Sequence, residues 1–386
     1  MKKEIPGRVF YIGAVLAGVG LLLGIISFMF DRTRSSYNVL IAFMFLMSIG
    51  VGSLFLVALE YIAGAVWSTP FRRVPELLSS MLFVLPFIAL ILLLNTGDLF
   101  HWAHHEAVER DAVLKAKSPY LNITFLAVRT AGVLLIWLLF YFLILKNSRA
   151  QDKSGDTSFS RKNIKLSAVF MPVFAITITI SAIDWMMSLE PHWFSTIFGV
   201  YYFAGTLLAA LAATTLVSVL LKENGFLHPG LVDDHYYSLG ALMFGFVNFW
   251  AYIAFSQFLL IWYANLPEEN FWFLLRWQNS WQAVSVILVL SHFIVPYFLL
   301  LSQPAKMNPK RLILVSVWIL CAHLLDIYWL VMPAYGRNGI VFGWMEIAFP
   351  VAIAGIIMLL FSYKARKVNL TPVGDPKLKS GLNFRL

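Results

Sequence analysis

Ten apolar stretches of about 20 residues follow one another along the chain, and this feature limits the fold more than any other. A helix of roughly 20 apolar residues crosses the roughly 30 Å hydrocarbon core of a bilayer, and lipid offers no partner for an open backbone. We therefore expect an all-α polytopic membrane protein with about ten transmembrane helices. Their approximate bounds are 9–30, 38–64, 77–96, 121–145, 165–188, 195–221, 236–263, 277–301, 311–333 and 339–363.

The composition supports a single integral membrane domain over residues 1–386. Hydrophobic residues make up 60% of the chain and charged residues only 13%, far from the average of a soluble domain. No soluble domain is inserted between the apolar stretches. The single cysteine, Cys321, lies within the ninth stretch, so the sequence offers no cysteine framework for an iron–sulfur cluster, structural zinc or covalent haem.

The distribution of basic residues predicts the orientation. With both termini cytoplasmic, the cytoplasmic segments, including Lys2 and Lys3, carry 21 of the 29 Lys and Arg residues, as the positive-inside rule requires. Basic loops that face anionic lipid also account for the net charge of +9. The positive charge of the chain therefore does not indicate a nucleic-acid partner.

A weak internal repeat in the sequence suggests how the helices are grouped. Asp184 precedes Pro191 by seven residues, and Asp326 precedes Pro333 by the same spacing, each pair at the outer end of a predicted helix. The second pair lies four helices after the first. We therefore predict two four-helix bundles, over 38–188 and 195–333, with 1–37 and 334–386 forming peripheral helices and a tail.

Ionisable residues inside the predicted helices are the main functional candidates, because a charge in hydrocarbon needs a partner, a water cavity or a function. We place His323 and Asp326 in the outer half, three residues apart on one helical face and within hydrogen-bonding reach. Imidazole beside carboxylate is the composition of a proton relay, although a plain interhelical hydrogen bond explains the pair too. The predicted proton path comprises Glu60, Asp184, His292, His323, Asp326 and Glu346, with Glu60 and His292 toward the inner half.

Other polar groups have structural or ligand-binding readings. Arg129 must find an anion, and Asp184 and Asp98 are the two candidates. Gln257 and Asn248 are most simply interhelical hydrogen bonds. The candidate quinone-binding residues are Asp98, His101, Arg129 and Gln257.

We predict no metal site and no haem in this chain. His101, His104 and His105 have a spacing that could bind metal, but they lie at an expected helix end, where histidine and tryptophan are ordinary interfacial anchors. A b-type haem needs two histidines at matched depth. The sequence places His292 and His323, the only histidines well inside apolar stretches, on opposite sides of the midplane.

Two stretches of sequence resemble a known family. "FWAYIAFSQFLLIWYANLPEENFWFLLRW" at 249–277 and "NTGDLFHWAHHEAVERD" at 95–111 are similar to membrane subunits of alternative complex III, a bacterial quinol:cytochrome c oxidoreductase, and most of all to its F subunit. These subunits belong with the membrane subunit of polysulfide reductase to a wider family of quinone-interacting anchors. The likeness runs over nearly the whole chain, but no quinone site is carried over residue by residue.

The resemblance implies a multi-pass subunit of the bacterial inner membrane. Its expected partners are a multihaem cytochrome, an iron–sulfur protein and a sister quinone-binding membrane subunit, so haem and iron–sulfur clusters would lie on those partners. The expected function is to anchor the redox subunits and to conduct protons coupled to oxidation of a quinol, menaquinol or ubiquinol. A pure assembly scaffold and a proton-coupled secondary transporter are the alternatives.

The polar end of the seventh apolar stretch suggests a docking site. We expect Trp262 and Tyr263 to anchor the outer interface and Pro267 to end the helix. Glu268 and Glu269 would then present an acidic surface to partner subunits.

Overall fold

The computed structural model describes residues 5–386, which form helices and no strand; Lys2 and Lys3 lie outside this range. Ten helical segments are long and apolar enough to cross a membrane, which confirms the predicted all-α polytopic architecture. They are α1 (Gly7–Phe30), α2 (Arg32–Ala63), α3 to α4 (Thr69–Leu94), α8 (Ile123–Ser154), α9 with η4 (Ser158–Leu189), α10 (Phe198–Glu223), α11 (Asp233–Ala264), α13 to α14 (Trp281–Leu300), α16 with η6 (Pro309–Ala334) and α17 (Trp344–Ala365).

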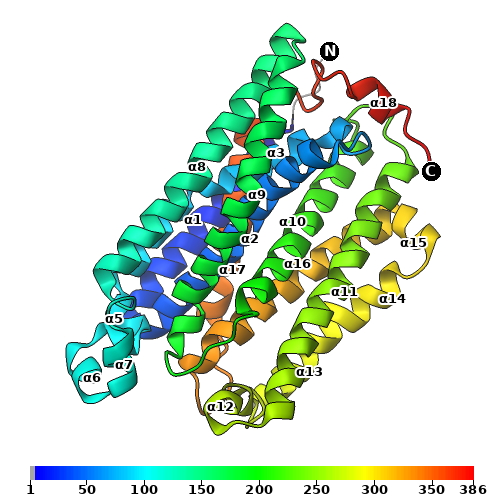
Figure 1. Ribbon diagram of the computed structural model, residues 1–386. Coiled ribbons are helices and arrows are strands. Elements are labelled where there is room, and N and C mark those ends of the chain that lie inside the picture. The colour runs from blue at the N-terminus through cyan, green and yellow to red at the C-terminus, as the bar shows by residue number, and fades with distance from the viewer. Residues whose placement is uncertain (1–4) are drawn as a thin grey trace.

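Short helices lie at the two ends of this assembly (Figure 1). One end, called the α12 end here, carries α5 (Thr96–Leu99), α6 (His105–Arg110), α7 (Ala112–Lys117) and α12 (Pro267–Arg276). The opposite end, called the α18 end, carries α3 (Arg73–Leu78), α15 (Gln303–Met307), α18 (Leu378–Leu382) and the C-terminal tail. The predicted cytoplasmic side corresponds to the α18 end, and the predicted outer side to the α12 end.

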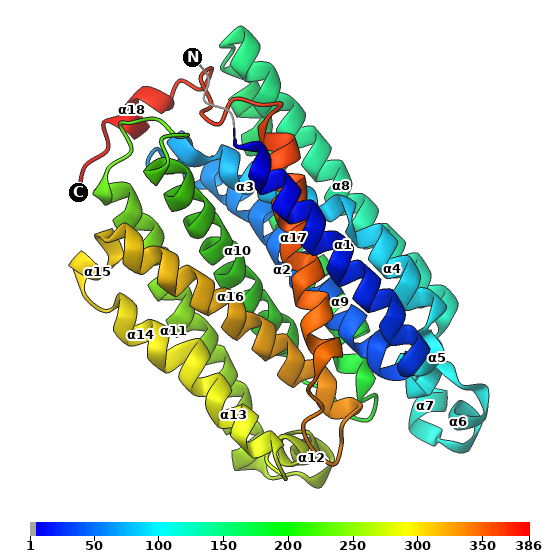
Figure 2. The ribbon, with the colours of Figure 1, turned by 180° about the vertical axis from the view of Figure 1, so that it is seen from behind.

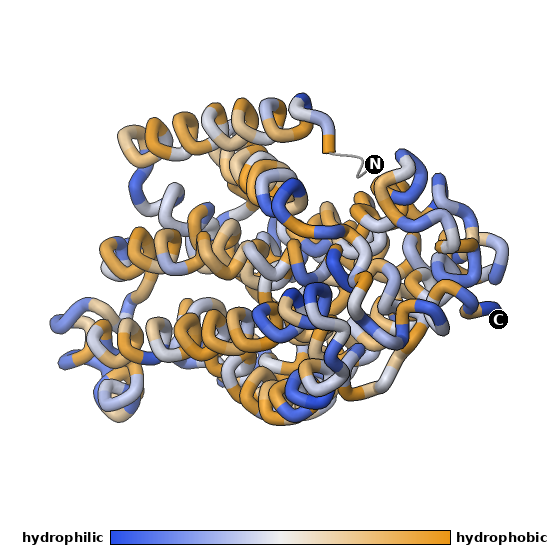
Figure 3. The backbone as a smooth tube through the Cα atoms, turned by 90° about the horizontal axis from the view of Figure 1, so that it is seen from above, coloured by the Kyte–Doolittle hydropathy of each residue, from blue (hydrophilic) through white to orange (hydrophobic). Residues whose placement is uncertain are grey.

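Helices α2 and α10 form the centre of the assembly and are its most deeply buried spans. Helix α2 packs against α9, α10 and α16, and α10 packs in addition against α11 (Figures 1 and 2). Helix α8 covers α9 on one side, whereas α13 and α14 lie beside α11 and α16 on the other. Apolar residues dominate the spans (Figure 3). The internal repeat itself stays a prediction.

Helices α1 and α17 pack closely against each other at the periphery (Figure 2). A Cβ atom on Gly355 would lie 2.1 Å from the backbone nitrogen of Ala17, and one on Gly20 would lie 2.4 Å from that of Ala352. Small residues allow this approach, and in lipid van der Waals packing is a main source of helix association.

Two helices depart from the regularity that the apolar pattern suggests. The span 281–300 contains a π-helical segment at Leu290–Ile294, which carries His292. Helix α11 ends at Ala264 because Asn265 adopts a left-handed conformation with φ of 48°. The prediction that Pro267 ends this helix is wrong, since Pro267 is the first residue of α12, a position that suits its fixed φ.

Candidate functional site

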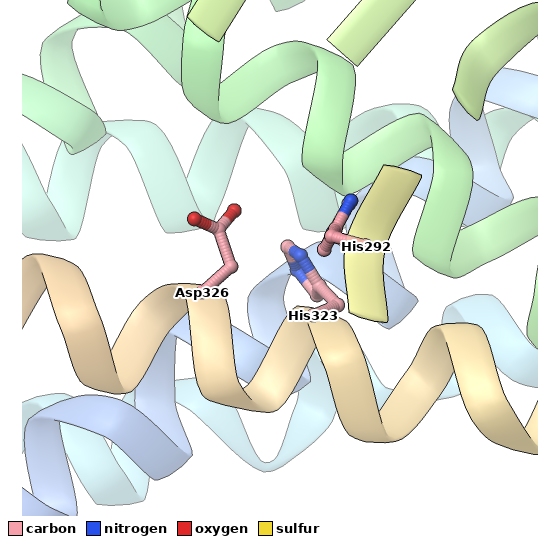
Figure 4. Close-up of side chains that lie close together, drawn as sticks. All are labelled: His292, His323 and Asp326. Atoms are coloured by element: carbon pink, nitrogen blue, oxygen red, sulfur yellow. The ribbon is translucent and has the colours of Figure 1, made fainter. Parts of the chain in front are cut away.

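Three ionisable side chains meet in the middle of the helical assembly (Figure 4). His292 comes from the π-helical segment, and His323 and Asp326 come from α16. The imidazole centroids lie 6.2 Å apart, and one ligand atom from each of the three residues falls within 4.8 Å of the others. Each residue is at most 2% exposed. We call these three residues the central cluster.

The central cluster contradicts the predicted depth of His292. His292 lies eleven residues after the start of α13, and His323 lies eight residues before the end of α16. At 1.5 Å per residue these offsets are roughly 16 and 12 Å from the α12 end, so both imidazoles lie near mid-depth. The prediction placed them on opposite sides because it began the eighth span four residues too early, at 277.

Asp326 is held by neutral hydrogen-bond donors. The Tyr201 hydroxyl donates to Oδ1 at 2.5 Å, and the Trp250 indole Nε1 donates to Oδ2 at 3.1 Å. No Lys, Arg or His nitrogen within residues 5–386 forms an ion pair with this carboxyl group. Burial of a carboxylate without a counter-charge is costly, and the cost falls when the group takes up a proton.

The two imidazoles have few partners of their own. His323 Nε2 lies 3.0 Å from the Ser48 hydroxyl, which also contacts the hydroxyls of Tyr202 and Thr206. His323 makes no hydrogen bond to Asp326, so the mutual bond that their spacing suggested is not formed. Neither ring nitrogen of His292, nor Nδ1 of His323, has a hydrogen-bond partner in the described part of the chain.

Neighbouring groups fix the positions of both rings. Trp250 stacks on His292 with centroids 3.9 Å apart. A Cβ atom at Gly205 would lie 2.9 Å from His323 Cε1, so glycine leaves room for the imidazole. The histidines thus lie at matched depth, contrary to the argument made against haem, and the absence of haem stays a prediction.

The central cluster has the composition of a metal site. Two imidazoles and one carboxylate are common zinc ligands, and bonds of about 2.0–2.2 Å would bring ligand atoms within roughly 4.4 Å of one another. The hydrogen bonds already made by both Asp326 oxygens explain that residue without an ion. His101, His104 and His105 do not form a comparable group: the metal-like set found among the described residues is the central cluster.

A cavity of about 780 Å³ adjoins the central cluster on the side of the α12 end. Its walls are mainly aromatic and aliphatic, and Tyr201 and Trp250, the two donors to Asp326, belong to its lining. Gln257 also lines it, 3% exposed, and its Oε1 has no hydrogen-bond partner over residues 5–386. The volume suits a small-molecule ligand. The remaining aromatic lining residues are Phe255, Phe258, Trp262, Trp272, Phe273, Trp277, Phe293 and Trp329.

The cavity opens toward the surface that the spans expose. Its lining residues Phe255, Trp262, Trp277 and Val289 are more than half exposed. Exposed aromatic and aliphatic side chains on a spanning helix face acyl chains, so a lipid-soluble molecule can enter sideways.

Arg276 closes the cavity at the α12 end and is itself 2% exposed. It donates to the carbonyls of Trp272 at 3.0 Å, Trp329 at 3.1 Å and Leu330 at 2.9 Å. These carbonyls belong to the last turns of α12 and α16, so the guanidinium caps two helix C-termini whose partial negative charges stabilise it. Burial lowers the pKa of Arg276 to about 9, which leaves it charged at neutral pH.

The other carboxylates of the predicted proton path contact guanidinium groups. Asp184 receives Nε and Nη2 of Arg129 at 2.8 and 3.0 Å, which decides between the two expected anions for Arg129. Glu346 receives Nε of Arg34 at 2.8 Å. Glu60 receives Nη1 of Arg72 at 3.1 Å, at the α18 end.

The candidate quinone-binding residues do not lie together. Asp98 forms a partly exposed ion pair with Arg32 at 2.9 Å, His101 is exposed, and Arg129 is bound to Asp184. Gln257 alone of the four lines the cavity. The expected interhelical hydrogen bond is absent for Gln257 and Asn248 within the described residues, since Asn248 donates to Phe244 of its own helix.

Sequence reasoning missed Tyr201, Trp250, Ser48 and Arg276. With 13 Trp and 15 Tyr in the chain, a buried aromatic residue carries no signal that separates a hydrogen-bond donor from packing. Arg276 lies between the seventh and eighth apolar stretches, and no local pattern in the sequence reveals that α12 contacts α16.

Comparison with protein-family models and with curated protein sequences finds no match for this chain.

Proposed function

We propose that this chain is the membrane subunit of a quinol-oxidising complex, in which Asp326 accepts a proton that quinol oxidation releases. One observation supports the proposal above the others: Tyr201 and Trp250 line the cavity and donate to the same buried carboxyl group. A single residue, Tyr201 or Trp250, thereby separates a ligand in the cavity from a proton acceptor.

The cavity suits a quinol ring with an isoprenoid tail. Aromatic walls stack against a flat ring, and the lipid-facing opening admits the tail. The Gln257 carbonyl oxygen, which lacks a donor, would accept the hydrogen bond of a ring hydroxyl. Menaquinol and ubiquinol both have these features. Asp98 and His101 remain candidates for a second contact near the surface.

Proton transfer would run from the cavity through Tyr201 to Asp326. A phenol can accept a proton on its oxygen while it donates its own to Oδ1, whereas the Trp250 indole only donates and therefore positions the carboxyl group. The electrons would pass to the redox centres of partner subunits. His323 and His292 are the next proton acceptors, because a neutral imidazole accepts at one nitrogen and donates at the other.

The partners proposed for this chain are those of a respiratory complex. We propose a multihaem cytochrome and an iron–sulfur protein docked at the α12 end, and a sister quinone-binding membrane subunit beside the spans. Glu268 is exposed and Glu269 is partly exposed in the first turn of α12, and the two offer an acidic surface for this docking.

A second candidate function is a scaffold that anchors redox subunits without moving protons. The ion pairs Arg129–Asp184 and Arg34–Glu346 favour it, because a bidentate, buried pair holds helices together and has no free acid to exchange protons. The first candidate function requires Asp326 to accept a proton, whereas the scaffold does not.

The test uses the affinity-tagged chain purified from its own membranes with whatever subunits accompany it. We expect haem absorption in the preparation and quinol-dependent reduction of a cytochrome. Asp326→Asn should leave the accompanying subunits in place and lower quinol turnover at least tenfold. The control Asp156→Asn removes an exposed carboxylate between α8 and α9, away from the cavity, and should leave turnover near wild type. Unchanged turnover in Asp326→Asn would reduce the protein to a scaffold.

A further inference from the structure

A buried group of six charged side chains lies at the α18 end, away from the central cluster. The group joins α2, α3, α8 and the C-terminal tail. We call it the carboxylate network, and it comprises Glu60, Arg72, Arg73, Glu76, Asp152 and Asp375.

Two guanidinium groups connect the network. Arg72 contacts Glu60 at 3.1 Å, Asp375 at 2.7 Å and Glu76 at 3.5 Å. Arg73 contacts Glu76 and, at 2.5 Å, Asp152. Asp152 is the most exposed member, with 15% of its side chain accessible, and therefore forms the mouth of the network at the α18 end.

The network holds more acids than bases. Four carboxylates face two guanidinium groups, so full ionisation would leave two uncompensated negative charges in a site where both arginines are at most 2% exposed. The nearby ammonium groups of Lys364 and Lys377 form no ion pair with these carboxylates within the described chain. Like charges at such distances favour protonation of one member.

The hydrogen bonds single out Glu60. Both oxygens of Glu76, Asp152 and Asp375 accept hydrogen bonds or ion-pair contacts. At Glu60, Thr69 and Arg72 both donate to Oε1, and Oε2 accepts no hydrogen bond from any residue between 5 and 386. An oxygen without a donor is the one that best carries a proton itself.

A second buried polar group lies beside the network without a partner. The ring of Tyr61, which follows Glu60 in α2, lies 4.8 Å from Arg72 Cζ, and Tyr61 is 3% exposed. Its hydroxyl has no hydrogen-bond partner over the described range. The network thus has an unpaired hydroxyl on the side chain that packs against Arg72, as well as a carboxylate with an unpaired oxygen.

We infer that the carboxylate network is a second proton-binding site, at the α18 end, with the proton on Glu60 Oε2. Helix α2 connects this site to the central cluster, because Ser48, which contacts His323, lies twelve residues before Glu60, about 18 Å along the helix. The inference stands on the network alone and does not require quinol binding.

The experiment compares two conservative variants of the full-length chain, purified in detergent. At neutral pH, Glu60→Gln should leave the melting temperature unchanged or higher, because the amide replaces an acid that is already neutral. The matched control Asp184→Asn removes the charge of a one-to-one buried pair and should lower the melting temperature clearly. A comparable loss in both variants would show that Glu60 is an ionised partner of Arg72 and would overturn the inference.

Infrared spectroscopy gives an independent readout. Glu60→Gln should remove one deuterium-sensitive carbonyl band of a protonated carboxylic acid. If the spectrum of Glu60→Gln kept every such band of the wild-type spectrum, the inference would also be overturned. Stabilisation by sodium chloride but not by choline chloride would identify a bound cation instead of a proton and would refute it equally. Loss of a different band in Asp326→Asn reports on the proposed function separately.

Discussion

The Arg129–Asp184 pair offers the sharpest test of which intramembrane acids are structural. The side chains are 9% and 2% exposed, and the guanidinium binds both carboxylate oxygens. Removal of one partner leaves a buried, uncompensated charge, which costs about 3–5 kcal/mol. Arg129→Met and Asp184→Leu should each destabilise the chain by this amount. Replacement of both by apolar residues removes both charges, so the double variant should lose less than either single variant.

The assay is equilibrium unfolding of the purified chain in mixed micelles, with the detergent titration followed by circular dichroism. The free energies of the two single variants and the double variant give a coupling energy, expected to exceed about 3 kcal/mol in magnitude. The exposed pair Glu106–Arg110, 3.9 Å apart, is the control, and Glu106→Gln should cost no more than about 0.5 kcal/mol. Additive single effects would refute the structural assignment and return Asp184 to the proton path.

Three further outcomes follow from the site and its surroundings. Gly205→Ala places a Cβ atom 2.9 Å from His323 Cε1, so it should cost about 1–3 kcal/mol of stability in the same unfolding assay and slow quinol turnover. Gln257→Leu should weaken binding of a short-chain quinol roughly tenfold, measured by quenching of cavity tryptophan fluorescence, if its amide accepts a ligand hydroxyl, which is worth about 1.5 kcal/mol. The hydrogen bond from His192 lowers the pKa of Asp111 in the folded protein. The ionised carboxylate therefore stabilises the α6–α7 loop fully at pH values above the pKa that Asp111 has in the unfolded chain. That stabilisation is lost as the pH falls through the lower folded pKa, and hydrogen exchange of the loop should accelerate there; a pH-independent exchange pattern would contradict it.

The architecture was predictable because the information is local. A run of apolar residues long enough to cross lipid specifies a helix by itself, and all ten predicted stretches correspond to spanning segments. The ends of the helices were less predictable. Helix α2 begins at Arg32 and not at 38, because the side chain of Asp31 caps it there. Polar residues at a helix end belong to the helix when a cap holds them.

The candidate site was predictable only in part. The need of a buried guanidinium for an anion correctly limited Arg129 to two partners, and the helical spacing correctly placed His323 and Asp326 on one helix face. The depth prediction failed, because an error of four residues at the start of the eighth span placed His292 on the other side of the midplane from His323. The donors Tyr201 and Trp250 depend on how three helices meet, and no local pattern reports that.

The π-helical segment at Leu290–Ile294 has a consequence for any attempt to re-engineer or realign this helix. An α-helix advances about 100° per residue, so one residue accommodated in a wider turn resets the angular phase of everything beyond it. Deletion of Leu290 would restore an uninterrupted repeat and swing His292 by that angle, off the Trp250 ring. Residues at equal spacing in the sequence therefore do not point in the same direction on the two sides of this segment. A gap of one position here in an alignment would change the direction of every side chain beyond it.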